Sequence, residues 1–227
     1  MNYISVAIDG PAGAGKSSIS KELARRLNFI YVDTGALYRS LAYVALKENL
    51  NTKTDIDKIS KLADNTTFSI KYIDGIQHLF ANENDITDYI RTAEVSKGAS
   101  DVSAIPHVRQ SLLEIQRNMA KTSNVIMDGR DIGTVVLPNA SIKIFLTASI
   151  DERAKRRYKE MTEKGIKTDF ELIKSDIIYR DEQDSNRPVA PLKPAEDSIL
   201  FDNSNYNFEQ SVEYLYNIIK ERSKNAL

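Results

Sequence analysis

The sequence contains no cysteine and has only two histidines among its 227 residues. The absence of cysteine excludes disulfides and thiolate metal sites, and it agrees with a reducing compartment, so we expect a cytoplasmic protein. A zinc site built from protein ligands alone is not expected, because neither His78 nor His107 belongs to a metal-ligand spacing. We interpret both histidines as ordinary surface or packing residues.

Long apolar runs and an excess of one charge are also missing. No apolar stretch approaches the ~20 residues that a membrane helix needs, so we expect no membrane partner. The formal net charge is −1, and without a global basic field we expect no nucleic-acid partner. The first predicted strand begins at Tyr3, which leaves no room for a cleaved signal peptide.

What the sequence does contain is a complete phosphate-binding motif near its start. Residues 10–17 read Gly-Pro-Ala-Gly-Ala-Gly-Lys-Ser and match G-x-x-x-x-G-K-[ST] at every fixed position. An apolar run from Tyr3 to Ile8 predicts a strand before the loop, and Ile19 and Leu23 lie on one face of a helix after it. A glycine-rich turn that binds nothing is the alternative, and the complete motif with both flanks disfavours it.

The chemistry of this motif suits a nucleoside triphosphate. Its glycines let backbone N–H groups turn inward, and the helix N-terminus adds partial positive charge. We expect Lys16 to reach the β- and γ-phosphates and Ser17 to bind Mg²⁺. The predicted ATP-binding residues are Gly10, Pro11, Ala12, Gly13, Ala14, Gly15, Lys16, Ser17 and Ser18.

Strands and helices alternate along most of the chain, which predicts an α/β fold with a parallel sheet and helices on its faces. The alternation of strands and helices is interrupted between residues 53 and 95. Residues 66–80 alternate like a hairpin around the turn signal Asp74-Gly75, so we expect a small antiparallel insert there. Near the C-terminus, Asn207 and Gln210 are predicted to cap the last helix.

Charged residues follow several predicted strands. Asp128 directly follows the strand predicted at 124–127 and is a candidate to hold Mg²⁺ through water, although a turn or cap carboxylate is the alternative. Five of the seven residues from Arg153 to Lys159 are basic. A solvated helix face explains such a run in general, but beside a polyphosphate site we favour arginines that close over the transferring phosphate.

A second set of arginines lies in or beside loops that follow strands, namely Arg39, Arg130, Arg180 and Arg187. Arginine binds phosphate in a bidentate manner, so these residues suggest a second phosphate and a phosphotransferase with an anionic acceptor. A switch GTPase is disfavoured because neither Asp-x-x-Gly after a strand nor Asn-Lys-x-Asp is present. An ATP-binding regulatory module would leave the recurring arginines unexplained.

Four blocks together make the resemblance specific: residues 10–18, 31–39 (Tyr-Val-Asp-Thr-Gly-Ala-Leu-Tyr-Arg), 127–136 (Met-Asp-Gly-Arg-Asp-Ile-Gly-Thr-Val-Val) and 180–192. With them the chain resembles the bacterial cytidylate kinases from end to end. The resemblance implies that ATP and CMP or dCMP are converted to ADP and CDP or dCDP with Mg²⁺, by a monomer. It also implies a three-layer P-loop fold with five parallel strands in the order 2-3-1-4-5.

The resemblance further implies one kinase domain over residues 1–227. Its core would comprise about 1–52, 96–150 and 170–227, with a nucleotide-binding insert at about 53–95 and an arginine-rich lid at about 151–169. The implied catalytic residues are Lys16, Asp128, Arg130, Arg153 and Arg157.

The same resemblance assigns the CMP site by position. Thr34, Arg109 and Arg187 would face the cytosine, and Arg39 and Arg130 would hold the phosphate. Ser100, Arg180 and Asp184 would hold the ribose. Arg180 and Asp184 are four residues apart, so we expect an ion pair between them if one helix carries both, with a plain surface pair as the alternative.

Overall fold

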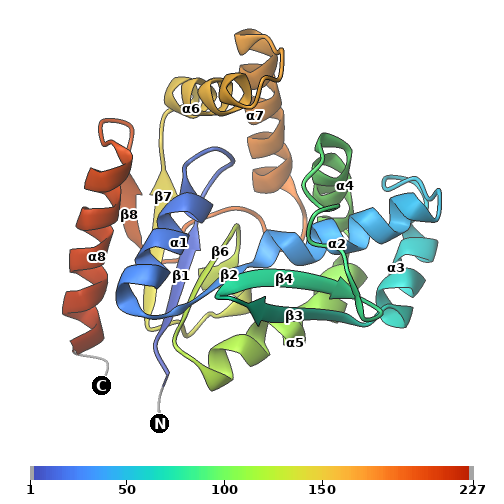
Figure 1. Ribbon diagram of the computed structural model, residues 1–227, viewed down its shortest axis with the longest axis horizontal. Helices are drawn as coiled ribbons and strands as arrows, with labels where there is room; N and C mark the ends of the chain where they lie inside the picture. The colour runs from blue at the N-terminus through green and yellow to red at the C-terminus, as the bar shows by residue number, and fades with distance from the viewer. Residues whose placement is uncertain (1–2, 225–227) are drawn as a thin grey trace. The chain divides into compact units, whose positions relative to one another are not determined.

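The computed structural model of this protein describes residues 3–224, and Figure 1 labels their helices and strands. Within this range the chain divides into two compact units, one made of residues 3–31 and 123–224 and the other of Val32–Thr122. The second unit is longer than the insert expected at 53–95, and the proposed division into core, insert and lid stays a prediction. Among the described helices, none combines the length and apolar character needed to cross a membrane.

A five-stranded sheet organises the first unit, and its strand β2 runs across the boundary between the units. In chain order its strands are β1 (Ser5–Asp9), β2 (Ile30–Asp33), β6 (Val125–Gly129), β7 (Ile142–Thr147) and β8 (Ile199–Asp202). They lie in the order β2-β6-β1-β7-β8. The labels differ from the predicted 2-3-1-4-5 because β3 to β5 form another sheet; numbered within this sheet alone, the order agrees. The structure confirms the α/β class with a parallel sheet.

The central strand β1 is buried, and its residues Val6, Ala7 and Ile8 have no exposed surface. A parallel strand is covered on both faces, which explains its continuous apolar run. Helices α1 (Lys16–Leu27) and α8 (Phe208–Lys224) contribute apolar residues such as Leu23 and Leu215 to the same core. Since the strands are parallel, the loops that leave their carboxyl ends share one edge of the sheet.

Three further elements of this unit follow the strands. They are the π-helix η1 (Ile132–Val136) and the helices α6 (Ile150–Glu163) and α7 (Phe170–Asn186). A small core of Ala154, Ile173 and Ile177 packs α6 against α7. The π-helix has no periodic signal in the sequence, and α7 continues six residues past the expected end at Arg180.

The second unit contains α2 (Thr34–Lys47), α3 (Ile56–Asn65), β3 (Phe68–Ile73), β4 (Ile76–Ala81), β5 (Asn84–Asp85), α4 (Ala93–Ser103) and α5 (Pro106–Thr122). The strands form an antiparallel sheet in the order β3-β4-β5. Asp74 and Gly75 both have positive φ and close the β3–β4 hairpin, as predicted. Helices and sheet share one apolar core.

Two helices of this unit were absent from the sequence interpretation. Helix α3 occupies the start of the region expected to hold only an antiparallel insert, and Ile59 and Ala63, four apart, are the signal that marks its buried face. Helix α4 begins at the Thr92 cap, whose side chain accepts a hydrogen bond from the Val95 N–H. The histidines form surface contacts with acidic residues, His78 with Asp85 and His107 with Asp64.

The predicted cap of α8 is present and gives a stability test. The Asn207 Oδ1 accepts from the Gln210 N–H at 2.8 Å, and the Gln210 Oε1 accepts from the Asn207 N–H at 3.0 Å. We expect Asn207→Ala to lower the free energy of unfolding by about 1 kcal/mol, measured by urea titration. Asn217→Ala, on the exposed middle of the same helix, is the control and should leave stability unchanged or slightly raised. Equal effects of the two variants would contradict the capping role.

Candidate active site

The phosphate-binding loop runs from the end of β1 to the start of α1. Gly10 has φ 151°, and a Cβ on it would lie 1.9 Å from the carbonyl oxygen of Leu146. Gly15 precedes the helix with φ 88°, in the left-handed region. Glycine is therefore required by contact at one end of the loop and by backbone conformation at the other.

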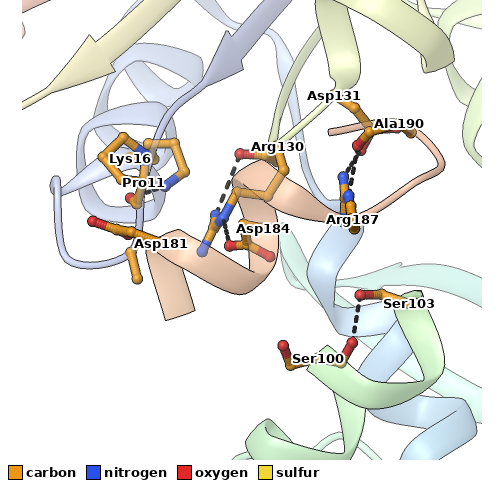
Figure 2. Close-up of polar contacts among 12 residues, drawn as sticks. Pro11, Lys16, Ser100, Ser103, Arg130, Asp131, Asp181, Asp184, Arg187 and Ala190 are labelled. Carbon is orange, nitrogen blue, oxygen red and sulfur yellow. Dashed lines mark hydrogen bonds and ion pairs between the residues drawn. The ribbon is translucent and has the colours of Figure 1, made fainter. Parts of the chain in front are cut away.

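Lys16 is buried at the first position of α1. Its Nζ donates to the carbonyl oxygen of Pro11 at 2.6 Å (Figure 2). Burial, and then the nearby Arg130 cation, lower the pKa of the Lys16 ammonium to about 7. Because its neighbours also include Asp128, this side chain belongs to a cluster of charged groups within the first unit.

The carboxylate of Asp128 is held on both sides. Its Oδ2 accepts from the Ser17 hydroxyl at 2.7 Å, and its Oδ1 accepts from the Tyr31 hydroxyl at 2.8 Å. Asp128 lies within β6 and is only 4% exposed, so it is not the turn or cap carboxylate that the sequence left open. A hydroxyl and a carboxylate at this distance are the oxygen ligands that Mg²⁺ prefers. Within residues 3–224, no group of three acidic, histidine or cysteine side chains forms a separate metal cluster.

Arg130 follows β6 and pairs with Asp184 of α7. The Arg130 Nε to Asp184 Oδ2 distance is 2.7 Å (Figure 2). The predicted ion pair between Arg180 and Asp184 is therefore wrong: one helix does carry both residues, but Asp184 pairs with Arg130 instead. The pairing is tertiary, because Arg130 lies on a loop 54 residues away in sequence.

Several arginine side chains lie near the loop that follows β6. Burial lowers the pKa of Arg180, and the charges of Arg157 and Arg130 lower it further. Arg130 acts on Lys16 in the same way. In contrast, against the effect of burial, Asp184 and then Asp128 raise the pKa of Arg130, so cations and carboxylates lie together here. A polyphosphate could pair with the cations of this cluster.

Hydrogen bonds also hold residues 131–133, which follow Arg130 in the chain. Asp131 accepts from Arg187 at 3.2 Å, and both side chains are buried (Figure 2). Asp9, at the end of β1, accepts from the N–H groups of Ile132 and Gly133 at 2.8 and 2.7 Å. Burial raises the pKa of Asp9 to about 6, although these two donors act in the opposite direction. Asp9 therefore anchors the backbone directly after Arg130 and Asp131.

The basic residues of α6 differ in their exposure and in the groups that they contact. Arg153 is 4% exposed, donates to the carbonyl oxygens of Ala148 and Ala12, and pairs with Asp181 at 2.7 Å. Arg157 is exposed and pairs with Glu160. Lys155 and Lys159 form exposed pairs of the kind found on any solvated helix.

The remaining predicted substrate residues lie in the second unit. Arg39 pairs with Asp33 at 2.7 Å, and its Nε is buried without a hydrogen-bond partner among residues 3–224. Arg109 is 7% exposed, donates to the Ser103 carbonyl and lies over the Tyr38 ring. Thr34 is buried at the start of α2. Figure 2 also shows Ser100 on α4, whose carbonyl accepts from the Ser103 hydroxyl.

Sequence interpretation missed three residues that hold this site: Asp9, Tyr31 and Asn203, whose side chain donates to the Ala14 carbonyl of the phosphate-binding loop. Asp9 and Tyr31 lie in or beside recognised motifs, so their positions directly before Gly10 and in the block at 31–39 were available signals. Asn203 follows β8 in a segment that carries no motif.

Comparison with known proteins identifies what this arrangement is similar to. The profile of the family described as cytidylate kinase matches residues 6–221. A cytidylate kinase of Streptococcus agalactiae is 50% identical over 216 residues, which cover 95% of each chain. A cytidylate kinase of Caldicellulosiruptor saccharolyticus is 49% identical over 210 residues, covering 92% of each.

Solved structures resemble the fold at much lower identity. A gluconokinase from Sinorhizobium meliloti superposes with a TM-score of 0.50 at 13% identity, covering 99% of this chain and 96% of its own. An uncharacterized protein from Eubacterium ventriosum gives a TM-score of 0.53 at 13% identity, covering 96% and 98%. At this identity the likeness concerns the fold alone.

Proposed function

This chain belongs to the cytidylate kinase family, enzymes that phosphorylate CMP with ATP, and from that premise we propose which of its residues carry the reaction. The phosphate-binding loop is proposed to bind ATP through Gly10, Pro11, Ala12, Gly13, Ala14, Gly15, Lys16, Ser17 and Ser18. The observation that supports this most is the charged cluster of Lys16, Asp128 and Arg130, which lies beside the loop in one unit.

The divalent metal that kinases use is proposed to be Mg²⁺. Ser17 would bind it directly and Asp128 would bind it through water, because their oxygens already lie 2.7 Å apart. When bound, the metal would supply positive charge that neutralises the charge developing on the phosphates during transfer. Tyr31, by donating to the other Asp128 oxygen, keeps the carboxylate in one orientation.

The CMP-binding residues are proposed for each unit by itself, from their positions in the family motifs. From the first unit, Arg130 binds the phosphate, Arg180 and Asp184 bind the ribose, and Arg187 binds the base. From the second unit, Arg39 binds the phosphate, Ser100 the ribose, and Thr34 and Arg109 the base. These roles rest on position within the family motifs, and the buried, hydrogen-bonded state of Arg187 and Arg109 supports them, since a fixed guanidinium is ready to donate.

The reaction needs no covalent enzyme intermediate. A phosphate oxygen of CMP attacks the γ-phosphorus of ATP in line, and the bond from that phosphorus to the β–γ bridging oxygen breaks to release ADP. Lys16, Arg130 and Arg157 are proposed to neutralise the charge on the transferring group, with Arg153 acting through the loop backbone. Closure of the lid over both nucleotides would exclude water and prevent hydrolysis of ATP. We also propose a cytoplasmic location, with which the cysteine-free composition agrees. The proposal that the protein is a monomer rests on the family resemblance.

Asp184 provides a direct test of the acceptor site. Asp184→Ala is expected to lower kcat/KM for CMP about 10²-fold, because it loosens the ribose and also releases the Arg130 that binds the phosphate. The KM for ATP should change little, since the loop is untouched. CMP- and dCMP-dependent release of ADP measures both constants.

Glu182→Ala serves as the control, because Glu182 is exposed on the same helix. It should leave the kinetics with CMP and ATP unchanged. Unaltered CMP kinetics in Asp184→Ala would remove this residue from the acceptor site and return it to a structural role.

A further inference from the structure

Three carbonyl groups of the phosphate-binding loop each accept a hydrogen bond from a side chain. Lys16 donates to Pro11 at 2.6 Å and Arg153 donates to Ala12 at 2.9 Å. The third donor is the Nδ2 of Asn203, which lies 3.2 Å from the carbonyl oxygen of Ala14. Asn203 stands outside every motif and has no role in the binding sites proposed above.

Asn203 is held in one orientation by its surroundings. It is 1% exposed, and its backbone N–H donates to the Thr147 carbonyl at 2.9 Å, directly after β8. Arg156 of α6 donates to the Asn203 Oδ1 at 2.9 Å and to its carbonyl oxygen at 2.8 Å. A guanidinium has no acceptor, so the carboxamide oxygen must face Arg156 and the NH₂ group must face Ala14.

The planarity of the peptide bond gives this contact a consequence for the loop. In a trans peptide the C=O and the following N–H point in opposite directions. A contact that holds the Ala14 carbonyl toward Asn203 therefore turns the Gly15 N–H away from Asn203. Arg153 fixes the Gly13 N–H in the same way through the Ala12 carbonyl. Glycine restricts the backbone less than other residues do, so the peptides of this loop could otherwise rotate. The side chains of Asn203 and Arg153 restrain that rotation.

We propose that Asn203 is a positioning residue of the ATP site, which orients the Ala14–Gly15 peptide and links it to α6 through Arg156. This inference rests on the proposed role of residues 10–18 in binding ATP. Two arginines of the basic run, Arg153 and Arg156, then serve to attach α6 to the loop and to the end of β8. A change of α6 position would consequently be transmitted to two N–H donors of the loop.

Asn203→Asp is the sharpest test, because it keeps the shape and the acceptor for Arg156 but removes the NH₂ donor. A carboxylate oxygen then faces the Ala14 carbonyl, so the peptide loses its orientation. We expect the Kd and the KM for ATP to rise about tenfold, while the KM for CMP stays within about twofold. Equilibrium binding of ATP without CMP, steady-state kinetics and the Tm are the measurements.

Arg156→Gln is the second variant and releases the carboxamide from its other side. A smaller rise in the Kd for ATP, again without a change for CMP, is expected. Asn124→Asp is the matched control: Asn124 accepts from the Ile4 N–H at the opposite edge of the same sheet, and its acceptor oxygen is retained. ATP binding by this control should equal that of the wild type.

The possible results distinguish a failure of the positioning role of Asn203 from a failure of the ATP-binding role proposed for residues 10–18. Normal ATP affinity in Asn203→Asp, or equal losses for ATP and CMP, would overturn the positioning role. If Asn203→Asp does not fold, Arg156→Gln decides by the same criterion. If Lys16→Ala also binds ATP as well as the wild type does, the assignment of residues 10–18 fails, whereas a loss confined to Lys16→Ala leaves that assignment intact.

Discussion

Lys16→Ala is expected to lower kcat for phosphoryl transfer by about 10²–10³-fold in a protein that remains folded. The ammonium is buried among charged neighbours, so its contribution to a developing phosphate charge is not screened by water. The fold should survive because the hydrogen bond from the Lys16 Nζ to the Pro11 carbonyl lies within the phosphate-binding loop itself. The measurements are kcat at saturating ATP and CMP together with the Tm.

Lys220→Ala is a suitable control for this substitution. Lys220 is exposed on α8 and lies over the Tyr216 ring, away from the phosphate-binding loop in sequence and in function. Its loss should leave turnover unchanged. A folded Lys16→Ala protein with near-normal turnover would contradict the role of the loop.

CMP and dCMP are expected to be phosphorylated up to about 10⁴-fold more efficiently than AMP or GMP, as compared by kcat/KM. The proposed base-binding residues Arg109 and Arg187 are 7% and 8% exposed. A buried donor that meets a base without the matching acceptor loses its hydration and gains no bond, which disfavours that base strongly. A coupled ADP-release assay across AMP, GMP, UMP, CMP and dCMP at one ATP concentration gives the ratios.

Arg187→Lys tests whether this selectivity comes from the guanidinium. Lysine keeps the charge but lacks the planar pair of donors, so the preference for CMP over AMP should shrink while the KM for ATP is retained. An unchanged preference would remove Arg187 from base recognition. Phosphorylation of AMP as efficient as that of CMP in the wild type would contradict the proposed specificity of the whole site.

Local features of this molecule were predictable from the sequence. The loop at 10–17, the hairpin turn at Asp74-Gly75 and the cap between Asn207 and Gln210 each depend on residues that are neighbours in the chain. Their conformations follow from glycine backbone freedom and from short side chains that reach the nearest N–H groups. The parallel sheet was predictable too, because alternation of strands and helices permits few connections.

The partners of charged side chains were decided by the tertiary structure. Spacing along a helix suggested that Asp184 pairs with Arg180, yet it pairs with Arg130 on a loop after β6. Within one basic run, Arg153 is buried and Arg157 is exposed, because only one of them faces the Ala12 carbonyl and Asp181.

Two contacts that hold the active site join residues more than 90 positions apart in the chain. Tyr31 donates to Asp128, 97 residues away, and Asn203 donates to Ala14, 189 residues away. Such pairs form because parallel strands bring their carboxyl ends to one edge of the sheet, whatever their separation in sequence. The sequence alone therefore determined the chemistry that is present, and the packing of the strands decided which groups meet to perform it.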